Sequence, residues 1–392
     1  MVRRLKSFVT RRLRLASYLQ APGDGRRWPV VPAHALVWAQ VVAYVLRDGA
    51  FHAVEALVRS RARRAIGITV RFNDDTLAYF TERLDPAPTR AALVAVVRQA
   101  KRNKAFDDVL FLGLVVDGTT VGHCTTAPCA LCHPLTNAQD QVVGYHHKLS
   151  LLSLVGGALV LPLDVEPYGP GDSEQAASER LLQRGVAALG GRFAQYVAGD
   201  GLYASAPFLH VASDLGLHPI VRLKANLPTL LAAAEARFTA QPPQLTLEID
   251  GDRVDLWDAD DFDPWDTLRW PTVRVLRYRQ QHPDGTLVEA YWLTDFPATR
   301  LSSRTLYRLA KSRWTIENQG FNDAKTRYGL DHIPHHHPNS LRVHWLLVAL
   351  ALTIERLYRI RYLHRGRHAR STPMQFLRRL RVSLGVPVRD TG

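Results

Sequence analysis

Three acidic residues stand where the chain is able to bring them together. Asp117 follows an apolar run of strand length, Asp200 follows a second predicted strand, and Glu317 lies in a helix-like run from Arg313 to Lys325. Sites in α/β proteins gather where strands end, so we expect the three carboxylates to meet. Carboxylates that meet repel one another unless cations neutralise them, and Mg²⁺ prefers oxygen ligands. Two such ions about 4 Å apart activate a water or a 3′-hydroxyl for in-line attack on a phosphodiester, and this set predicts that chemistry.

The charges around Glu317 fit this chemistry but also permit a simpler interpretation. On a regular helix, Arg313 lies about 40° from Glu317, and Lys325 lies about 80° away on the other side. A carboxylate flanked by two cations suits a metal ion held beside a phosphate. The alternative is an ordinary surface salt bridge, which contributes roughly a few tenths of a kcal/mol. Only the presence of the other two acidic residues favours the metal site.

Motifs in a fixed order carry a resemblance to a known family. They are Asp117-Gly118-Thr119, Gly-Asp-Gly-x-Tyr around Asp200, and Arg-Trp-x-Ile-Glu-Asn-x-Gly-Phe-Asn around Glu317. Over about residues 107–355 the chain resembles the DDE transposases of bacterial insertion sequences, the group marked by a Tyr-Arg-Glu-Lys signature. The resemblance implies a ribonuclease-H-like fold with a β-rich insertion before the glutamate helix. It also implies Asp117, Asp200 and Glu317 as ligands of two Mg²⁺ ions, for which Mn²⁺ can substitute.

The same resemblance implies residues that contact DNA. Arg313 matches the signature arginine, which holds a DNA phosphate near the transposon end. Trp314 resembles a tryptophan that in some relatives stacks near a displaced base, and a buried helix aromatic would explain it equally well. Tyr203, three residues after Asp200, matches a tyrosine common in the family, and packing of a first helical turn on the sheet is its alternative explanation.

Two positions depart from the signature. Its tyrosine would fall at Ala310, and the nearest candidate is Tyr307, one turn earlier. Its lysine would fall at Ala324, whereas the chain has Lys325. On a regular helix this shift of one residue turns the side chain by about 100°. A long lysine still reaches toward DNA from there, so Lys325 remains a predicted DNA contact.

The cysteines fall within one short segment that has partial zinc-ligand spacing. The segment reads Cys129-x-x-Cys132-His133, and further potential ligands nearby are His123, Cys124, His146 and His147. A second Cys-x-x-Cys pair is missing, so a zinc ion at Cys129 and Cys132 would need ligands from scattered positions. The alternative is a group of small buried thiols. A histidine run at 335–337 is predicted to be an exposed approach to a helix.

Composition restricts the partners and the compartment. The 392 residues carry a formal charge of +14 and a pI of about 10.0, which attracts polyanions such as nucleic acid. The longest apolar run, Leu149 to Leu163, is too short to span a membrane, and no secretory signal or basic amphipathic anchor stands out. Clustered cysteines do not suggest a disulfide framework. We expect a protein of the bacterial cytoplasm, associated with the nucleoid, that binds double-stranded DNA and no membrane.

The sequence pattern predicts an α/β fold, whose helices and strands position these residues. Residues 1–105 read as helical, and the helix Thr89–Lys104 has an apolar side and a basic side. The predicted strands before the insertion are Val109–Val116, Val142–Leu154, Ala158–Val165, Arg192–Ala198 and His218–Lys224, with a hairpin turn at Gly156-Gly157. Predicted helices at Ser173–Leu189 and Ser205–Leu215 separate the later strands, and a buried helix at Asn339–Tyr358 closes the core.

Changes in this pattern divide the chain into consecutive parts. They are a helical, DNA-end-binding domain (1–105), the first part of a ribonuclease-H-like catalytic domain (106–226), a β-rich insertion (227–297), the second part of the catalytic domain (298–360) and a basic C-terminal tail (361–392). The mixed sheet of the catalytic domain is expected to be flanked by helices.

The expected function is a DNA transposase. It would recognise the terminal inverted repeats of its element as a homodimer, cut at the 3′ ends with two Mg²⁺ ions and join those ends to target DNA. One alternative is a metal-dependent nuclease of the same fold that cuts without joining. The other is a DNA-binding protein derived from a transposase whose active site is dead, an idea that the departures at Ala310 and Ala324 keep open.

Overall fold

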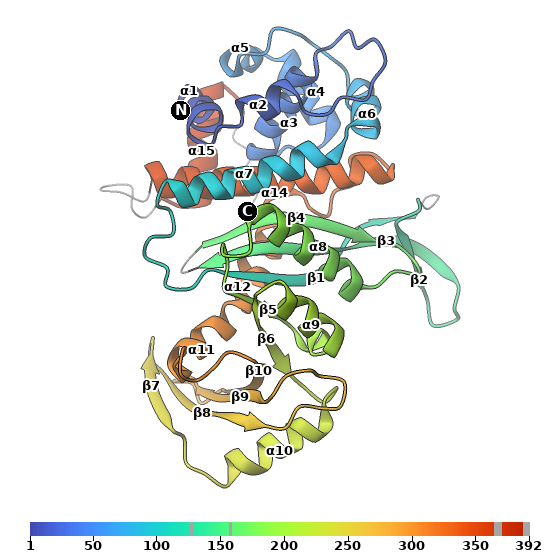
Figure 1. The fold of residues 1–392 in the computed structure, drawn as a ribbon. Coiled ribbons are helices and arrows are strands. Elements are labelled where there is room, and N and C mark those ends of the chain that lie inside the picture. Colours follow the sequence, from blue (N-terminus) through green and yellow to red (C-terminus); the bar gives the residue numbers. More distant parts are fainter. Residues whose placement is uncertain (126–128, 157–158, 364–370, 387–392) are drawn as a thin grey trace.

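The fold is mixed α/β, with a large mixed sheet flanked by helices (Figure 1). The computed structural model describes residues 1–125, 129–156, 159–363 and 371–386. Helices from both ends of the chain lie together on one side of the sheet, with α7 (Pro86–Arg102) and α14 (Pro338–Tyr362) running next to it (Figure 1). No helix among the described residues is long and apolar enough to cross a membrane.

The N-terminal helices pack on α14 rather than on one another alone. Tyr44 in α3 bonds His344 of α14 at 2.6 Å, and Thr81 in α6 donates to Ser340 of α14 at 2.9 Å. Their apolar side chains belong to the same core as the sheet. Besides α7 and α14, the helices of this layer are α1 (Val2–Ser7), the π-helix η1 (Phe8–Arg12), α2 (Ala16–Gln20), α3 (Ala33–Val45), α4 (Phe51–Arg59), α5 (Ala62–Ile66), α6 (Asp74–Arg83) and, from the other end of the chain, α15 (Pro373–Leu384).

Ten strands form one continuous sheet. Its order is β2-β3-β1-β5-β6-β10-β9-β8-β7, and β4 pairs with the part of β3 that β2 leaves free. Strands β1, β5 and β6 run parallel, and every other pair is antiparallel. The strands are β1 (Gly113–Cys124), β2 (Cys132–Thr136), β3 (Val142–Gly156), β4 (Leu159–Tyr168), β5 (Tyr196–Gly199), β6 (His218–Leu223), β7 (Leu245–Ile249), β8 (Asp252–Phe262), β9 (Val273–Gln281) and β10 (Leu287–Thr294).

Strand β1 differs from its prediction in its bounds. The apolar run predicted a strand ending at Val116, and residues 114–116 are indeed fully buried. The strand begins later, at Gly113, and Leu110 is 82% exposed. It also continues to Cys124, because an antiparallel ladder with β3 carries it onward. An apolar run reports burial on both faces of a sheet, but it does not report how far a partner strand extends.

The segment predicted as a β-rich insertion continues the main sheet. Strand β10 pairs with β6, with Leu293 opposite Val221. The predicted turns at Asp250-Gly251 and Asp284-Gly285 are confirmed: Gly251 and Gly285 adopt positive φ angles of 90° and 85°, which glycine tolerates. The predicted hairpin of β3 and β4 is confirmed as an antiparallel pair, and its turn residue Gly157 lies outside the described residues.

The other helices cover the sheet or follow it. Helix α14 is buried along most of its length, as its nearly all-round apolar sequence predicted. Parallel strands need a crossover, and α9 supplies the one between β5 and β6. These elements are α8 (Glu174–Leu189), the short 3₁₀ turn η2 (Gly201–Tyr203), α9 (Ala206–Asp214), α10 (Pro228–Thr239), α11 (Ser303–Lys311), α12 (Arg313–Thr315), the π-helical turn η3 (Ile316–Phe321) and α13 (Asn322–Tyr328).

Candidate active site

Asp117 and Asp200 lie side by side on neighbouring parallel strands. The parallel pairing of β1 with β5 runs to Val115 opposite Ala198, so each aspartate stands two residues beyond that pair. Asp200 directly follows β5, as the strand-end prediction requires. Asp117 instead lies within β1, opposite Leu151 of β3. The strand-end prediction is therefore wrong for Asp117, because the antiparallel ladder outlasts the parallel one.

Arg313 joins Asp117 to Glu317. Its guanidinium donates to Asp117 Oδ2 at 3.4 Å and to Glu317 Oε1 at 2.8 Å. The Arg313 side chain is 7% exposed, whereas that of Glu317 is 44% exposed. The arginine is thus more buried than the glutamate. It lies between the carboxylate of Asp117, on the first strand of the sheet, and that of Glu317, in the turn η3 after the last strand. This is more than an i,i+4 surface pair, since the same guanidinium also bonds a carboxylate on β1.

Asp200 is held by a second cation. Lys224, directly after β6, donates from Nζ to Asp200 Oδ2 at 2.8 Å. The other oxygen, Oδ1, is buried and has no hydrogen-bond partner among the described residues. Burial raises the pKa of Asp200, but the bonds from Lys224 and the Gly201 N–H and the charge of Arg313 outweigh it, so the pKa lies below its usual value. The field of Arg313 therefore reaches all three acidic residues.

Asp117 has a strongly perturbed carboxyl group. Burial is the main cause that raises its pKa to about 7; the charge of Arg313 opposes this, and the charges of Glu174 and Glu317 add to it. The carboxylates are spaced by Arg313 rather than drawn into one closed set of ligands. A buried carboxyl with acidic neighbours ionises readily only if a cation approaches it. The arrangement can therefore take up positive charge.

Glu174 is a fourth acidic residue of this site that the sequence did not reveal. It is the first residue of α8, whose N-cap Ser173 accepts from the Ala176 N–H. The Glu174 carboxylate packs directly against Gly118, where a larger residue would not fit, because an added Cβ would lie 2.1 Å from the carboxylate. In the sequence, Ser173-Glu174 reads only as the start of a helix. Its closeness to Asp117 arises from the packing of α8 on β1 and β3 and has no local signal.

Tyr203 is fully buried beneath Glu174. Its hydroxyl donates to Glu174 Oε1 at 2.9 Å and lies 3.0 Å from the hydroxyl of Ser178. Tyr168 donates to the other oxygen of Glu174 at 3.3 Å. The buried position of the Tyr203 ring agrees with the alternative explanation, in which the residue packs on the sheet. Its hydroxyl is directed at an acidic residue next to Asp117.

The helix that carries Glu317 is not regular. It begins as α12, continues as the π-helical turn η3 and ends as α13. The prediction of a regular helix over this run is therefore wrong. A π turn bonds residue i to i+5 instead of i+4, so one extra residue enters the turn. Arg356 of the buried helix α14 supports the turn by donating to the backbone oxygen of Gln319 and, at 3.0 Å, to Asp323.

The π turn changes the place of Lys325. With one residue taken up by the turn, the eighth residue after Glu317 falls where the seventh would stand on a regular helix, about 20° from Glu317 rather than about 80°. Ala324 is 4% exposed and faces the core, while Lys325 Nζ donates to the backbone oxygen of Thr120 at 2.7 Å. Thr120 lies on β1, three residues after Asp117. Lys325 therefore reaches the strand that carries the first aspartate.

Trp314 lies in an aromatic cluster on the side of the helix toward β9 and β10. Its ring meets that of Trp292 edge-on at 5.5 Å, and the Lys311 ammonium lies 4.7 Å from its centroid. The side chain is half-buried. Tyr307, the nearest candidate for the signature tyrosine, is buried, and its hydroxyl bonds Gln280 of β9 at 3.4 Å.

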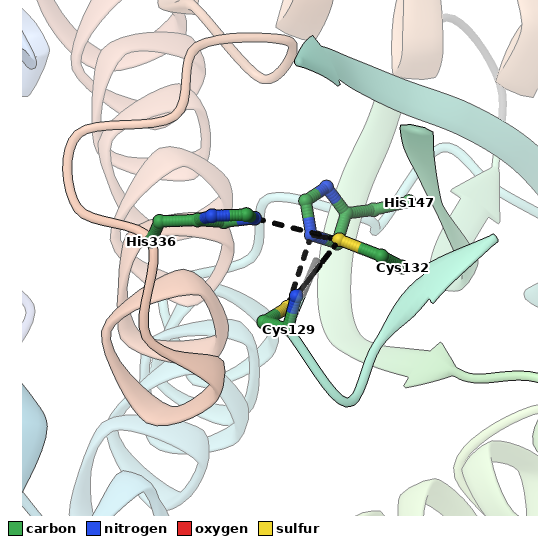
Figure 2. Close-up of side chains that lie close together, drawn as sticks. All are labelled: Cys129, Cys132, His147 and His336. Atoms are coloured by element: carbon green, nitrogen blue, oxygen red, sulfur yellow. Dashed lines mark hydrogen bonds between the residues drawn. The ribbon is translucent and has the colours of Figure 1, made fainter. Parts of the chain in front are cut away.

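A second cluster of potential ligands lies farther along β1 and β3 (Figure 2). Cys129, Cys132, His147 and His336 place one ligand atom each within 4.8 Å of one another. Cys132 and His147 stand opposite each other in the β2–β3 ladder. His336 comes from the loop before α14, so the prediction of an exposed histidine run there is wrong: residues 335–337 are half-buried.

Several neighbouring histidines have partners outside this group. His133 bonds the backbone oxygen of Tyr168 at 2.9 Å. Cys124 Sγ lies 3.8 Å from His336 Nε2 but outside the group of four. His335 bonds Glu82 at 2.8 Å, and His337 caps α14 by accepting from the Asn339 N–H. Sequence spacing found Cys129 and Cys132, whereas His336 is reached only through the fold.

The segment that contains both clusters matches a known family. The family model described as "Transposase DDE domain" matches residues 111–354. A comparison with curated proteins finds no match. Among solved structures, the chain is similar to the piggyBac transposase synaptic complex with hairpin DNA, determined by cryo-EM, with 13% sequence identity and a TM-score of 0.45. That similarity covers 92% of this chain and 74% of the piggyBac chain.

Proposed function

The chain belongs to the transposase DDE domain family and is a DNA transposase, and we propose that Asp117, Asp200 and Glu317 are its catalytic carboxylates. They would cut DNA at the ends of the element and join these ends to target DNA by two-metal phosphodiester transfer. The observation that carries the proposal is the Arg313 guanidinium, which bonds Asp117 and Glu317 and whose charge acts on Asp200. The family match gives the activity, and this contact supports its assignment to these three residues.

The acidic residues fit divalent metal ions. Asp200 has a buried oxygen without a hydrogen-bond partner among the described residues, and burial of Asp117 makes its ionised form depend on a nearby cation. Asp117, Asp200 and Glu317 would hold two Mg²⁺ ions, or Mn²⁺ in their place, through carboxylate oxygens. When bound, such ions supply an activated water or 3′-hydroxyl and stabilise the leaving oxygen.

The cations of the site prepare it for DNA. Arg313 orients Asp117 and Glu317, and Lys224 orients Asp200. We propose that Arg313 exchanges one of its carboxylates for a DNA phosphate, since a guanidinium binds either anion in a planar fork. Trp314, half-buried at the rim, would then lie next to the bound strand. Tyr203 acts through Glu174 rather than by touching DNA.

Lys325 supports the finer family assignment. The π turn takes up one residue between Glu317 and Lys325, which supports Lys325 as the equivalent of the signature lysine. We therefore assign the chain to the bacterial insertion-sequence group with the Tyr-Arg-Glu-Lys signature, with Tyr307 as its tyrosine. The central strands β4-β3-β1-β5-β6, with their last three parallel, support a ribonuclease-H-like catalytic domain at 106–226 and 298–360.

The helical part would hold the DNA ends. Arg98, Lys101 and Arg102 of α7 line an open groove with Arg192, and a basic groove attracts phosphates. This supports the proposed assignment of residues 1–105 to DNA-end binding. The β-rich insertion at 227–297 and the basic C-terminal tail at 361–392 are separate parts of the proposed organisation. Since an element has two ends, we propose a homodimer on double-stranded DNA, acting at the nucleoid of a bacterial cell.

Paired DNA assays test the proposed function. The purified chain is incubated with Mg²⁺ and a duplex carrying the inverted repeats that flank its coding sequence, and in parallel with a pre-cut end and a target plasmid. We expect cleavage of the first and joining of the second. A nuclease would cleave without joining, and a dead transposase would bind the duplex but do neither. Either of those outcomes overturns the proposal.

A further inference from the structure

The Cys129, Cys132, His147 and His336 side chains point toward one another, with one ligand atom from each lying within 4.8 Å of the others (Figure 2). The Cys129 and Cys132 sulfurs are 3.6 Å apart, and each lies 3.4 Å from His147 Nε2. His336 Nε2 lies 3.4 Å from the Cys132 sulfur. A tetrahedral ion with Zn–S bonds of about 2.3 Å and Zn–N bonds of about 2.0 to 2.1 Å has S···S edges of about 3.8 Å and S···N edges of about 3.6 Å. The one S···S and three S···N distances given above are close to these values.

We propose that Cys129, Cys132, His147 and His336 form a structural Zn²⁺ site. Two thiolates and two imidazoles in a tetrahedron are the ligand set that zinc takes in structural sites, whereas Mg²⁺ and Ca²⁺ require oxygen ligands. All four positions are filled by protein atoms, which leaves no open position for a water or a substrate. The role of the ion is therefore structural and separate from phosphodiester chemistry.

The local backbone supports sulfur as a ligand. The Cys129 N–H donates to the Cys132 sulfur at 3.3 Å, a contact that stabilises a thiolate held by a metal ion. Cys132 and His147 are fixed opposite each other by the β2–β3 register, and both are buried. Only His336 comes from a distant segment, 204 residues after Cys132. Binding of the ion would thus link two strands of the sheet to the loop before α14.

This link would fix the loop across the end of β1. The loop, residues 329–337, passes so close to Gly122 that a Cβ there would lie 2.9 Å from Ile333. It directly follows α13, whose Lys325 bonds Thr120 on the same strand. A zinc ion at His336 would therefore hold the end of the Glu317 helix against the strand that carries Asp117. The site is a brace for the active site and contributes no atom to it.

Metal analysis of the purified chain tests the site. The protein is produced with zinc in the medium, desalted, and measured by inductively coupled plasma mass spectrometry. We expect about one zinc per chain. Replacement of zinc by Co²⁺ should give visible absorption bands typical of tetrahedral sulfur ligation. A stably folded, metal-free protein, or one that holds iron alone, would overturn the proposal.

Two variants and a matched control identify the ligands. His336→Ala and Cys132→Ser should lose most of the zinc and lower the melting temperature by several degrees, whereas Cys124→Ser should keep both. Should Cys132→Ser fail to fold, His336→Ala in the loop before α14 and the Co²⁺ spectrum of the unmodified chain still decide the question. Full zinc content in His336→Ala would contradict the assignment.

The test is independent of DNA cleavage. Zinc content is measured without DNA, and a zinc-containing chain that fails to cut would refute the proposed function but leave the zinc site intact. The reverse result, cleavage by a chain that binds no zinc, would refute the zinc site and leave the proposed function intact.

Discussion

The two groups of potential ligands each have one member on the β1–β3 ladder, and they are built in opposite ways. Asp117 stands opposite Leu151, and His147 stands opposite Val121 farther along β1. At the first position the carboxylates are spaced by Arg313, and Glu317 is partly exposed. At the second, the sulfur and nitrogen atoms of the Cys/His cluster already converge within 4.8 Å.

Charge explains this difference. Thiols and imidazoles are largely neutral near pH 7, so a fold can pack them together without a counter-ion. Carboxylates are ionised at that pH and repel one another. The carboxylate site must therefore include cations such as Arg313 and Lys224 and stay open to others, whereas the fold alone can assemble the Cys/His cluster. Substitutions in the carboxylate site should therefore lower the cleavage rate, whereas substitutions in the Cys/His cluster should lower the stability of the fold.

The largest expected effect is the loss of cleavage in Asp117→Asn, Asp200→Asn or Glu317→Gln. Each should lower the cleavage rate by about 1,000-fold or more, a loss of roughly 4 kcal/mol of transition-state stabilisation. Zinc content and the circular dichroism spectrum should stay unchanged, because no core contact is removed. The assay is the initial rate on an end duplex, with Glu248→Gln on the exposed edge strand β7 as the control. Full cleavage activity in any one of the three variants would contradict the assignment of that residue to the catalytic site.

The next effect concerns stability and pH. Burial raises the pKa of Asp117 to about 7, against about 3.9 in the unfolded chain. The favourable contribution of the neutral carboxyl is thus fully present below about pH 4 and is lost as pH rises toward 7. Asp117→Asn should therefore unfold with a larger free energy than the unmodified chain at pH 8.5, by on the order of 1 to 4 kcal/mol.

Chemical denaturation in Mg²⁺-free buffer measures this difference. At pH 5 the gain should be much smaller than at pH 8.5, and added Mg²⁺ should stabilise only the unmodified chain. Asp75→Asn on the exposed side of α6 is the control. An equal stability gain at both pH values would mean that Asp117 is not held neutral by burial.

A smaller effect tests the π turn. Lys325→Gln should lower cleavage by about 10- to 100-fold, as expected for one phosphate contact worth roughly 1.4 to 2.7 kcal/mol. Moving the lysine by Ala324→Lys with Lys325→Ala should not restore activity, because residue 324 is buried. On a regular helix, the swap would restore it. Arg253→Gln, whose side chain is 56% exposed on β8, serves as the control.

The sequence was informative wherever the signal is local. Turns such as Asp250-Gly251 and the all-round apolar helix α14 follow from residue types within a few positions, and both are confirmed. The sequence also placed Arg313 one helical turn before Glu317, and the two do form an ion pair. Such features depend on spacing that a single element enforces.

What the sequence could not supply depends on distant partners. The extension of β1 beyond Asp117 is set by β3, and the extra residue in the Glu317 helix is supported by Arg356 from α14. His336 and Glu174 become neighbours of their clusters only when remote elements pack. A helical wheel assumes i→i+4 bonds, so it misplaced Lys325 for a physical reason.

The smallest expected effect concerns Glu174 and asks how far the carboxylate site extends. Burial is the main cause of the raised pKa of Asp117, and the negative charge of Glu174 raises it further. Glu174→Gln removes that charge, so the pKa of Asp117 should fall by about half a pH unit, roughly 0.7 kcal/mol. The measurement is a double-mutant cycle with Asp117→Asn across the pH range of unfolding, and Glu179→Gln on the same helix is the control. No shift would place Glu174 outside the field of Asp117. A loss of cleavage as large as that of Asp200→Asn would instead make Glu174 a fourth metal ligand.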